Sequence, residues 1–107
     1  MKLRNPFSDE TRSLFIFETT CWKCNRPSPE LHHILGRISS SPLNAHPLCP
    51  TCHSKHIEMK GDQNIRNFLK ETLLFLIKEG YKFTQEDYKF MEDNRRHYEK
   101  IIKELKP

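Results

Sequence analysis

Apolar residues in the second half of the chain recur every three or four positions. Between Gly61 and Gly80 one stripe is formed by Ile65, Phe68, Leu69, Thr72, Leu73 and Leu76. This spacing predicts an amphipathic helix that ends near Gly80. A second long helix is expected after the N-cap candidate Thr84, with a stripe at Tyr88, Met91, Tyr98, Ile102 and Leu105. We expect these two helices to pair as a hairpin.

The first half of the chain is interrupted more often and predicts shorter elements. In chain order these are a helix over residues 8–18 with Ser8 as its N-cap, a strand over 31–35, a loop over 36–45 and a strand over 46–48. A further helix is expected over residues 52–60, because no helix breaker occurs before Gly61. The elements together predict a small α+β fold.

The four cysteines form two Cys-x-x-Cys pairs, Cys21 with Cys24 and Cys49 with Cys52. Two-residue spacing lets both sulfurs of a pair reach one tetrahedral Zn²⁺ at about 2.3 Å. In a reducing compartment such pairs are better interpreted as thiolate ligands than as disulfides. We therefore predict a closed structural zinc site that stabilises a chain of 107 residues.

Charge favours an anionic partner only mildly. The net charge is +4, and residues 1–61 carry eight Lys or Arg against five Asp or Glu. No secretion signal is expected from residues 1–17, and the longest apolar run, Leu73 to Ile77, is far shorter than the roughly 20 residues that span a bilayer. We expect an intracellular, cytoplasmic protein with no membrane partner.

The gap between the two cysteine pairs is longer than in simple zinc ribbons, and it contains adjacent histidines, His32 and His33. Asn44 lies five residues before Cys49, and His53 directly follows the last cysteine. In this order and spacing, the pattern over about residues 15–60 resembles the HNH endonucleases, which use a ββα-metal (His-Me finger) fold.

This resemblance, together with the helical spacing after Gly61, divides the chain into two parts. Residues 1–61 would form a zinc-stapled nuclease core, in which the four cysteines bind structural Zn²⁺ and the histidines lie in the insertion. Residues 62–107 would form a C-terminal helical hairpin, packed on the core or mediating dimerisation. Compact nucleases of this kind are similar to those encoded by bacteriophages and mobile elements, for which the location would be the host cytoplasm.

The resemblance also implies a role for each residue of the site. His33 would be the general base that takes a proton from the attacking water. His32 and His53 would bind the catalytic divalent ion, and Asn44 would bond across the loop and orient His33. His56 lies at a position that the family fills variably, so its part as a metal ligand stays open.

These residue types suit phosphodiester hydrolysis. Histidine, with an unperturbed pKa of about 6.5, can accept a proton near neutral pH, and a cation neutralises charge that develops on the phosphoryl oxygens. Mg²⁺ or Mn²⁺ is expected as the catalytic ion, with Ni²⁺ or Zn²⁺ as alternatives. Because side chains alternate along a strand, His32 and His33 face opposite ways unless the backbone is distorted, so a shared cleft rests on the resemblance.

DNA is the expected partner, and its phosphates would be contacted by cations near the site. The candidates are Arg37, Lys55, Lys60 and Lys23, with Arg26 close by. The protein would be a monomer that nicks one strand, or a homodimer formed through the C-terminal helices.

Three other functions remain open from the sequence. The first is a catalytically silent zinc module that binds nucleic acid or a protein, with His32 and His33 on its surface. The second is a nuclease that acts on RNA, and the third is a redox protein that uses its Cys-x-x-Cys pairs. His46 and His97 are interpreted as structural or solvated.

Overall fold

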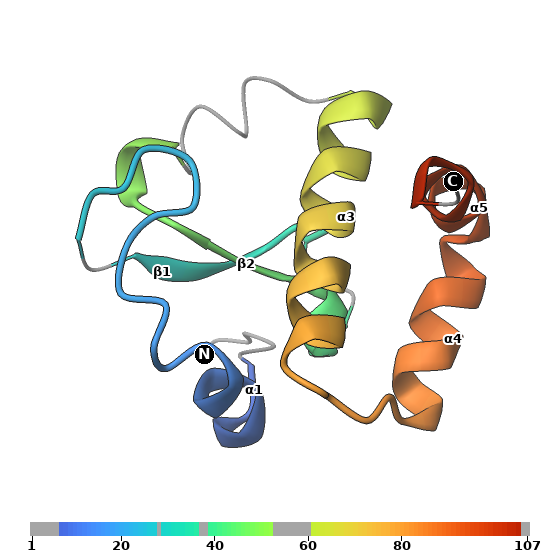
Figure 1. Cartoon of the computed structure of the whole chain (residues 1–107), viewed down its shortest axis with the longest axis horizontal. Helices are drawn as coiled ribbons and strands as arrows, with labels where there is room; N and C mark the ends of the chain where they lie inside the picture. Colours follow the sequence, from blue (N-terminus) through green and yellow to red (C-terminus); the bar gives the residue numbers. More distant parts are fainter. Residues whose placement is uncertain (1–6, 28, 37–38, 53–60, 106–107) are drawn as a thin grey trace, which may run out of the picture.

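A two-stranded antiparallel sheet and a set of helices make up the computed structural model, which describes residues 7–27, 29–36, 39–52 and 61–105 (Figure 1). Its elements are α1 (Asp9–Leu14), β1 (Glu30–His33), the 3₁₀ helix η1 (Pro42–Asn44), β2 (Ala45–Leu48), α3 (Asp62–Lys78), α4 (Gln85–Asp93) and α5 (Arg95–Leu105). Residues 50–52 are also helical. The predicted α+β fold is confirmed, whereas most of the helix predicted over 52–60 lies outside the described residues.

The two strands form the predicted ribbon. Glu30 lies opposite Leu48, and the ladder continues through His32 opposite His46 to His33 opposite Ala45. The segment predicted as a loop contains η1, since Ser41 caps this short helix by accepting a hydrogen bond from Leu43 N at 3.1 Å.

Helix α3 is the central element and lies between the ribbon and the two C-terminal helices (Figure 1). Its predicted stripe is confirmed, because Phe68, Leu69, Thr72, Leu73 and Leu76 are all buried. The predicted end of this helix is also confirmed. Gly80 follows it with a φ of +74°, a left-handed conformation that glycine adopts without a steric cost.

The prediction of one long helix after Thr84 is wrong, because the chain breaks into α4 and α5 at Asn94. The Nδ2 group of Asn94 donates to Phe90 O at 2.8 Å and thereby satisfies a carbonyl at the end of α4. The break also changes which residues face inward. Tyr88, Ile102 and Leu105 of the predicted stripe are exposed, while the buried set consists of Asp87, Phe90, His97, Tyr98 and Ile101.

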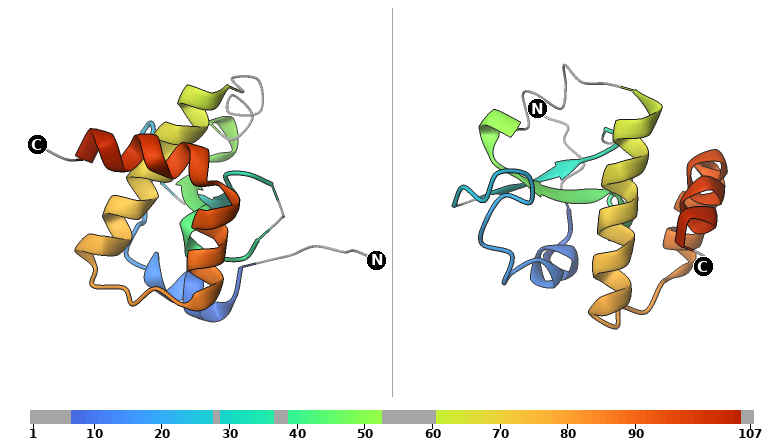
Figure 2. Two further views of the ribbon diagram at one scale, coloured as in Figure 1. Left: turned by 90° about the vertical axis from the view of Figure 1, so that its right-hand side faces the viewer. Right: turned by 45° about the horizontal axis from the view of Figure 1, so that its top comes forward.

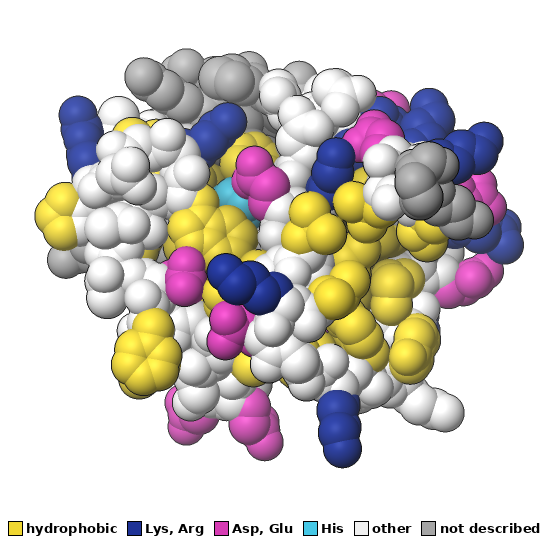
Figure 3. All heavy atoms as spheres, viewed as in Figure 1, with side chains coloured by type: hydrophobic (Ala, Val, Ile, Leu, Met, Phe, Trp, Pro, Cys, Tyr) yellow, Lys and Arg dark blue, Asp and Glu magenta, His cyan; other side chains and the backbone are white. Residues whose placement is uncertain are grey.

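The C-terminal helices pack on the rest of the fold. Helix α5 lies across α3, and α4 contacts η1 (Figure 2). One hydrophobic cluster therefore joins both halves of the chain; it includes Leu43 and Leu48 from the ribbon segment and Leu69, Leu76 and Ile101 from the helices. Hydrophobic side chains still gather at the surface over α3, α4 and α5 (Figure 3). Dimerisation through these helices stays a prediction.

Helix α1 closes the other side of the ribbon. It begins after Ser8, the predicted N-cap, whose Oγ accepts from Thr11 N at 3.2 Å, but it ends at Leu14, earlier than predicted. Phe7 and Phe15, which flank this helix, are buried with Ala45 of β2. Among the helices of the described residues, none is long and apolar enough to cross a membrane.

The buried His97 of α5 makes the stability of the fold depend on pH. Its side chain is 7% exposed, and burial together with the neighbouring Arg66 charge lowers the pKa of His97 below its ordinary value. The unfolded chain therefore binds this proton more readily than the folded chain. We expect the free energy of unfolding to fall as the pH drops below about 6.5, by at most about 1.4 kcal/mol per pH unit for this proton.

Urea unfolding of the wild type and of His97→Gln at about pH 7.5 and about pH 5 measures this contribution. The loss of stability between the two pH values should be smaller in the variant, because glutamine does not titrate. An equal loss in both proteins would show that His97 is not responsible.

Candidate metal centre and histidine site

The four cysteines come together at one end of the ribbon. All four Sγ atoms lie within 4.8 Å of one another, and those of Cys24 and Cys49 are 3.5 Å apart. Four thiolates around a tetrahedral Zn²⁺ lie about 3.8 Å apart when each Zn–S bond is about 2.3 Å. The cluster thus has the donor set and the compactness for a structural metal ion such as zinc.

Local backbone bonds shape the first cysteine pair. Cys21 N donates to Arg26 O at 2.8 Å and Asn25 N donates to Cys21 O at 2.9 Å, which closes a tight turn. Asn25 takes the left-handed conformation that the turn requires, with φ +65°. Lys23 N then points at Cys21 Sγ and donates to it at 3.3 Å.

The second pair begins where β2 ends. Cys49 directly follows this strand, and Cys52 lies in the helical turn of residues 50–52. Two contacts fix the pairs relative to each other: Trp22 N donates to Pro47 O at 3.1 Å, and the Arg26 guanidinium donates to Thr51 Oγ1 at 3.1 Å. The ribbon therefore positions both halves of the cluster.

The thiols of the cluster differ in acidity. Burial opposes ionisation of Cys21, but hydrogen bonds from backbone N–H groups outweigh it and lower the pKa of Cys21 to about 6. Burial and the other three sulfurs raise the pKa of Cys52 to about 12. Without a cation Cys52 therefore stays protonated near neutral pH, so the binding of a metal ion by all four sulfurs would release a proton from Cys52.

The side chains of His32 and His33 project from opposite faces of β1. The ladder continues without a bulge through both residues, so their side chains alternate, and His32 shares a face with His46. The His33 ring stacks on Phe7 with 4.0 Å between ring centroids and an angle of 9° between the planes. The described ribbon therefore does not turn both imidazoles to one face.

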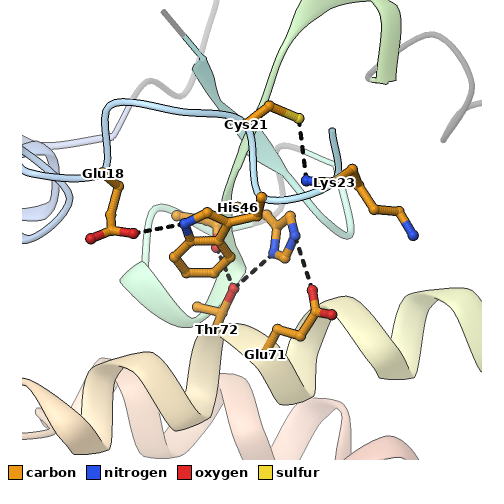
Figure 4. A network of polar contacts seen from close by, with 8 residues as sticks. Glu18, Cys21, Lys23, His46, Glu71 and Thr72 are labelled. Carbon is orange, nitrogen blue, oxygen red and sulfur yellow. Dashed lines mark hydrogen bonds and ion pairs between the residues drawn. The ribbon is translucent and has the colours of Figure 1, made fainter. Parts of the chain in front are cut away.

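His46 is a buried structural residue (Figure 4). Thr72 Oγ1 donates to Ala45 O at 2.6 Å, so it accepts from His46 Nδ1, which lies 3.2 Å away. The other ring nitrogen lies 3.3 Å from Glu71 Oε1, at the exposed side of α3. Burial lowers the pKa of His46, and the Glu71 carboxylate opposes this effect. The residue fastens β2 to α3 between the rings of Trp22 and Phe68.

Asn44 bonds across the loop that joins the two strands. Its Oδ1 accepts from Leu35 N at 2.9 Å, while its Nδ2 donates to Gly36 O at 2.9 Å and to Ser39 O at 3.0 Å. Its backbone carbonyl accepts from Ile34 N at 2.8 Å. The fully buried Asn44 thus fixes the turn that directly follows His33.

Replacing Asn44 with alanine should lower the free energy of unfolding by about 2 to 4 kcal/mol, because three backbone groups lose a buried partner. Urea unfolding of the zinc-loaded protein measures this loss. Asn67→Ala is the control, since Asn67 is exposed on α3 and its loss should cost about 0.5 kcal/mol or less. Equal losses for the two variants would show that the bonds of Asn44 do not stabilise the turn.

The remaining predicted site residues fall into two groups. Lys23 is described and lies with its ammonium 5.3 Å from the centre of the Phe68 ring. His53, His56, Arg37, Lys55 and Lys60 lie outside the described residues. Their predicted roles stay predictions.

Three residues that contact His33 or the segment of η1 were not predicted as part of the site. Phe7 stacks on His33, and Ser41 and Asp87 meet next to η1. These contacts join segments that lie far apart in the sequence, so no local pattern could identify them.

Comparison of the chain with protein-family models, with curated proteins and with solved structures finds no match.

Proposed function

We propose that this chain is a metal-dependent endonuclease of the HNH type, which hydrolyses DNA phosphodiester bonds with His33 as the general base. The observation that carries the proposal is the set of bonds made by Asn44, which closes the turn after His33 with both the oxygen and the NH2 group of its side-chain amide. A second support is the four-cysteine cluster beside the same ribbon.

In this proposal His33 accepts the proton of the attacking water. Its half-buried ring is kept in one plane by Phe7, and Asn44 fixes the backbone that follows it. A base with a fixed orientation can approach the water along one direction, which favours proton transfer. His32 would bind the divalent ion together with His53, and that ion, when bound, supplies charge neutralisation at the phosphate.

The opposite directions of His32 and His33 bear on where the phosphate would bind. Both residues lie at the end of β1, and His33 is its last residue. The proposal therefore places the scissile phosphate across the end of the ribbon, where groups from both faces can approach it. Lys23 and Arg26 lie in the cysteine turn near the other end, and they would contact neighbouring phosphates of the DNA.

The four-cysteine cluster has a separate part in the proposal. With four sulfur ligands a zinc ion has no open position for water or substrate. Its role would be to hold both ends of the insertion that carries the histidines, because Cys21 and Cys24 precede β1 and Cys49 follows β2.

Labelled duplex DNA and single-stranded RNA of the same sequence test the proposed substrate. The zinc-loaded protein should cut the DNA in the presence of Mg²⁺ or Mn²⁺ and leave it intact when no divalent ion is added. Preferential cutting of RNA would assign the site to a ribonuclease instead.

A catalytically silent zinc module is the second candidate, and the stacking of Phe7 on His33 favours it. The buried ring of Phe7 lies 4.0 Å from the imidazole of His33 and covers one of its faces. Such stacking is also expected of a histidine whose role is to pack against the core. In that case the protein should bind duplex DNA without cutting it under any divalent ion, and the affinity should fall steeply with salt.

A further inference from the structure

Asp87 is a buried carboxylate of α4 whose hydrogen-bond partners are Ser41, Tyr81 and Thr84. Its residue is 1% exposed, although it stands in the first turn of α4, where an acidic residue is normally solvated. Removing a charge from water is costly unless hydrogen bonds replace the lost solvent. Such a residue therefore needs an explanation beyond helix capping.

The two oxygens of Asp87 have different partners. Oδ2 accepts from Thr84 N at 2.8 Å, from Thr84 Oγ1 at 3.1 Å and from Tyr81 OH at 2.6 Å. The bond from Thr84 N forms the capping box of α4 together with the bond from Asp87 N to Thr84 Oγ1 at 3.3 Å. Oδ1 does not take part in the capping box and instead accepts from Ser41 Oγ at 2.6 Å, across 46 positions of sequence. One oxygen of Asp87 thus caps α4, and the other contacts Ser41 at the start of η1.

Ser41 is also hydrogen-bonded to Asn44 and thereby connects Asp87 with it. While its hydroxyl donates to Asp87, its oxygen accepts from Leu43 N at 3.1 Å, and its carbonyl accepts from Asn44 N at 2.9 Å. The hydroxyl is therefore fixed in direction by a donor and an acceptor. Ser41 and Asn44 are both fully buried, so water cannot replace either partner.

The chain of contacts ends at the turn after His33. Asn44 is the last residue of η1, and its Oδ1 accepts from Leu35 N, two positions after His33. Every link is a hydrogen bond within 3.1 Å between groups that are at least partly buried. Helix α4, which contributes no predicted site residue, is thereby connected to the turn that the proposed base precedes.

We propose that Asp87 is a positioning residue for the nuclease site: by fixing Ser41, it holds η1 and the Asn44 side chain against the turn after His33. The catalytic consequence of this inference rests on the proposed function. The hydrogen bonds that connect Asp87 through Ser41 and Asn44 to Leu35 do not depend on it. It assigns the C-terminal helices a part in the site, in addition to packing.

A pair of variants separates this role from the stability of α4. Ser41→Ala removes the bond to Asp87 Oδ1 together with the bond from Leu43 N to Ser41 Oγ, and it leaves the capping box of α4 intact. Thr84→Ala is the matched control, because it removes a hydroxyl bonded to the same carboxylate and leaves the bond to Ser41 intact. Ser41→Thr restores a hydroxyl and should restore the wild-type behaviour.

The first measurement is amide hydrogen exchange at Leu35, whose N–H is bonded to Asn44. In Ser41→Ala this exchange should be at least about tenfold faster relative to that of amides in the middle of α3, which report global unfolding. In Thr84→Ala the ratio should stay as in the wild type. Equal ratios in the two variants would overturn the inference, whether or not the protein cuts DNA.

The second measurement is DNA cleavage by the same variants. Ser41→Ala should lower kcat by about 10- to 100-fold with little change in KM, since the base is displaced while the DNA contacts remain. An unchanged kcat in Ser41→Ala beside an active wild type would overturn the catalytic part. An inactive wild type with the expected exchange at Leu35 would refute the proposed nuclease and leave the connection standing.

Asp87→Asn tests the carboxylate while Ser41 Oγ and its bond from Leu43 N are kept, and it also serves if Ser41→Ala does not fold. Asparagine has the size of aspartate, and its amide oxygen can still accept from Thr84 N at the place of Oδ2. Its NH2 group then faces Ser41 Oγ and cannot accept from that hydroxyl, so the bond from Ser41 is lost. Exchange at Leu35 should again increase relative to α3, by less than in Ser41→Ala. No increase in this variant would contradict the role of the carboxylate.

Discussion

Substitution of His33 by alanine is expected to slow DNA cleavage by about 10²- to 10⁴-fold, the usual contribution of a general base. The water would lose its proton acceptor, while the four-cysteine cluster and the bonds of Asn44 would be unaffected. Because the His33 side chain also stacks on Phe7, a modest loss of stability should accompany the substitution. The initial rate of cleavage at equal zinc content measures the effect.

Glu30→Ala is the matched control for His33→Ala. Glu30 is exposed and opens the same strand, so its replacement changes β1 without touching the proposed base. Its cleavage rate should stay within a factor of about two of the wild type. If both variants kept the wild-type rate, His33 would not be the base and the mechanism would need another proton acceptor.

Loss of the metal from the cysteine cluster is expected to unfold the protein. The apparent free energy of binding of a structural zinc ion is about 10 to 16 kcal/mol. This is as large as the whole free energy of unfolding of a small domain, which is about 5 to 15 kcal/mol. Cys49→Ser should have a similar effect, because Cys49 is 2% exposed and its sulfur touches that of Cys24.

Circular dichroism during titration with a chelator measures this dependence. The helical signal should be lost as zinc is removed and should return when zinc is added back. Cys24→Ser offers a graded comparison, because it also leaves three sulfurs but changes an exposed residue in place of the buried Cys49. It should weaken zinc binding with a smaller loss of structure than Cys49→Ser. A wild type that melts at the same temperature with and without the chelator would exclude a structural zinc site.

Local patterns in the sequence predicted the helices and strands that depend on local causes. The stripe of α3, its end at Gly80 and the caps Ser8 and Thr84 all follow from spacing and from groups within a few residues. The break at Asn94 was missed because the apolar spacing continues across it. Once the helix restarts there, α5 presents Ile101 to the core where the pattern had placed Ile102.

The site was predictable to a similar extent. The two cysteine pairs meet because each is a local turn and the ribbon brings the turns together. Alternation along the regular β1 accounts for the opposite directions of His32 and His33, whereas a cleft shared by both histidines rests on the resemblance and stays a prediction. The stacking of Phe7 and the link from Asp87 to Ser41 depend on tertiary packing, and a capping-box aspartate looks the same in sequence whether it is solvated or buried.

The most direct test of the proposed nuclease is the fate of supercoiled plasmid incubated with zinc-loaded wild-type protein and Mg²⁺ or Mn²⁺. The proposal predicts nicked circles with the divalent ion, none without it, and none from His33→Ala at equal zinc content. Plasmid that stays supercoiled with every divalent ion, while the wild type is folded and zinc-bound, would contradict the nuclease and favour the silent zinc module.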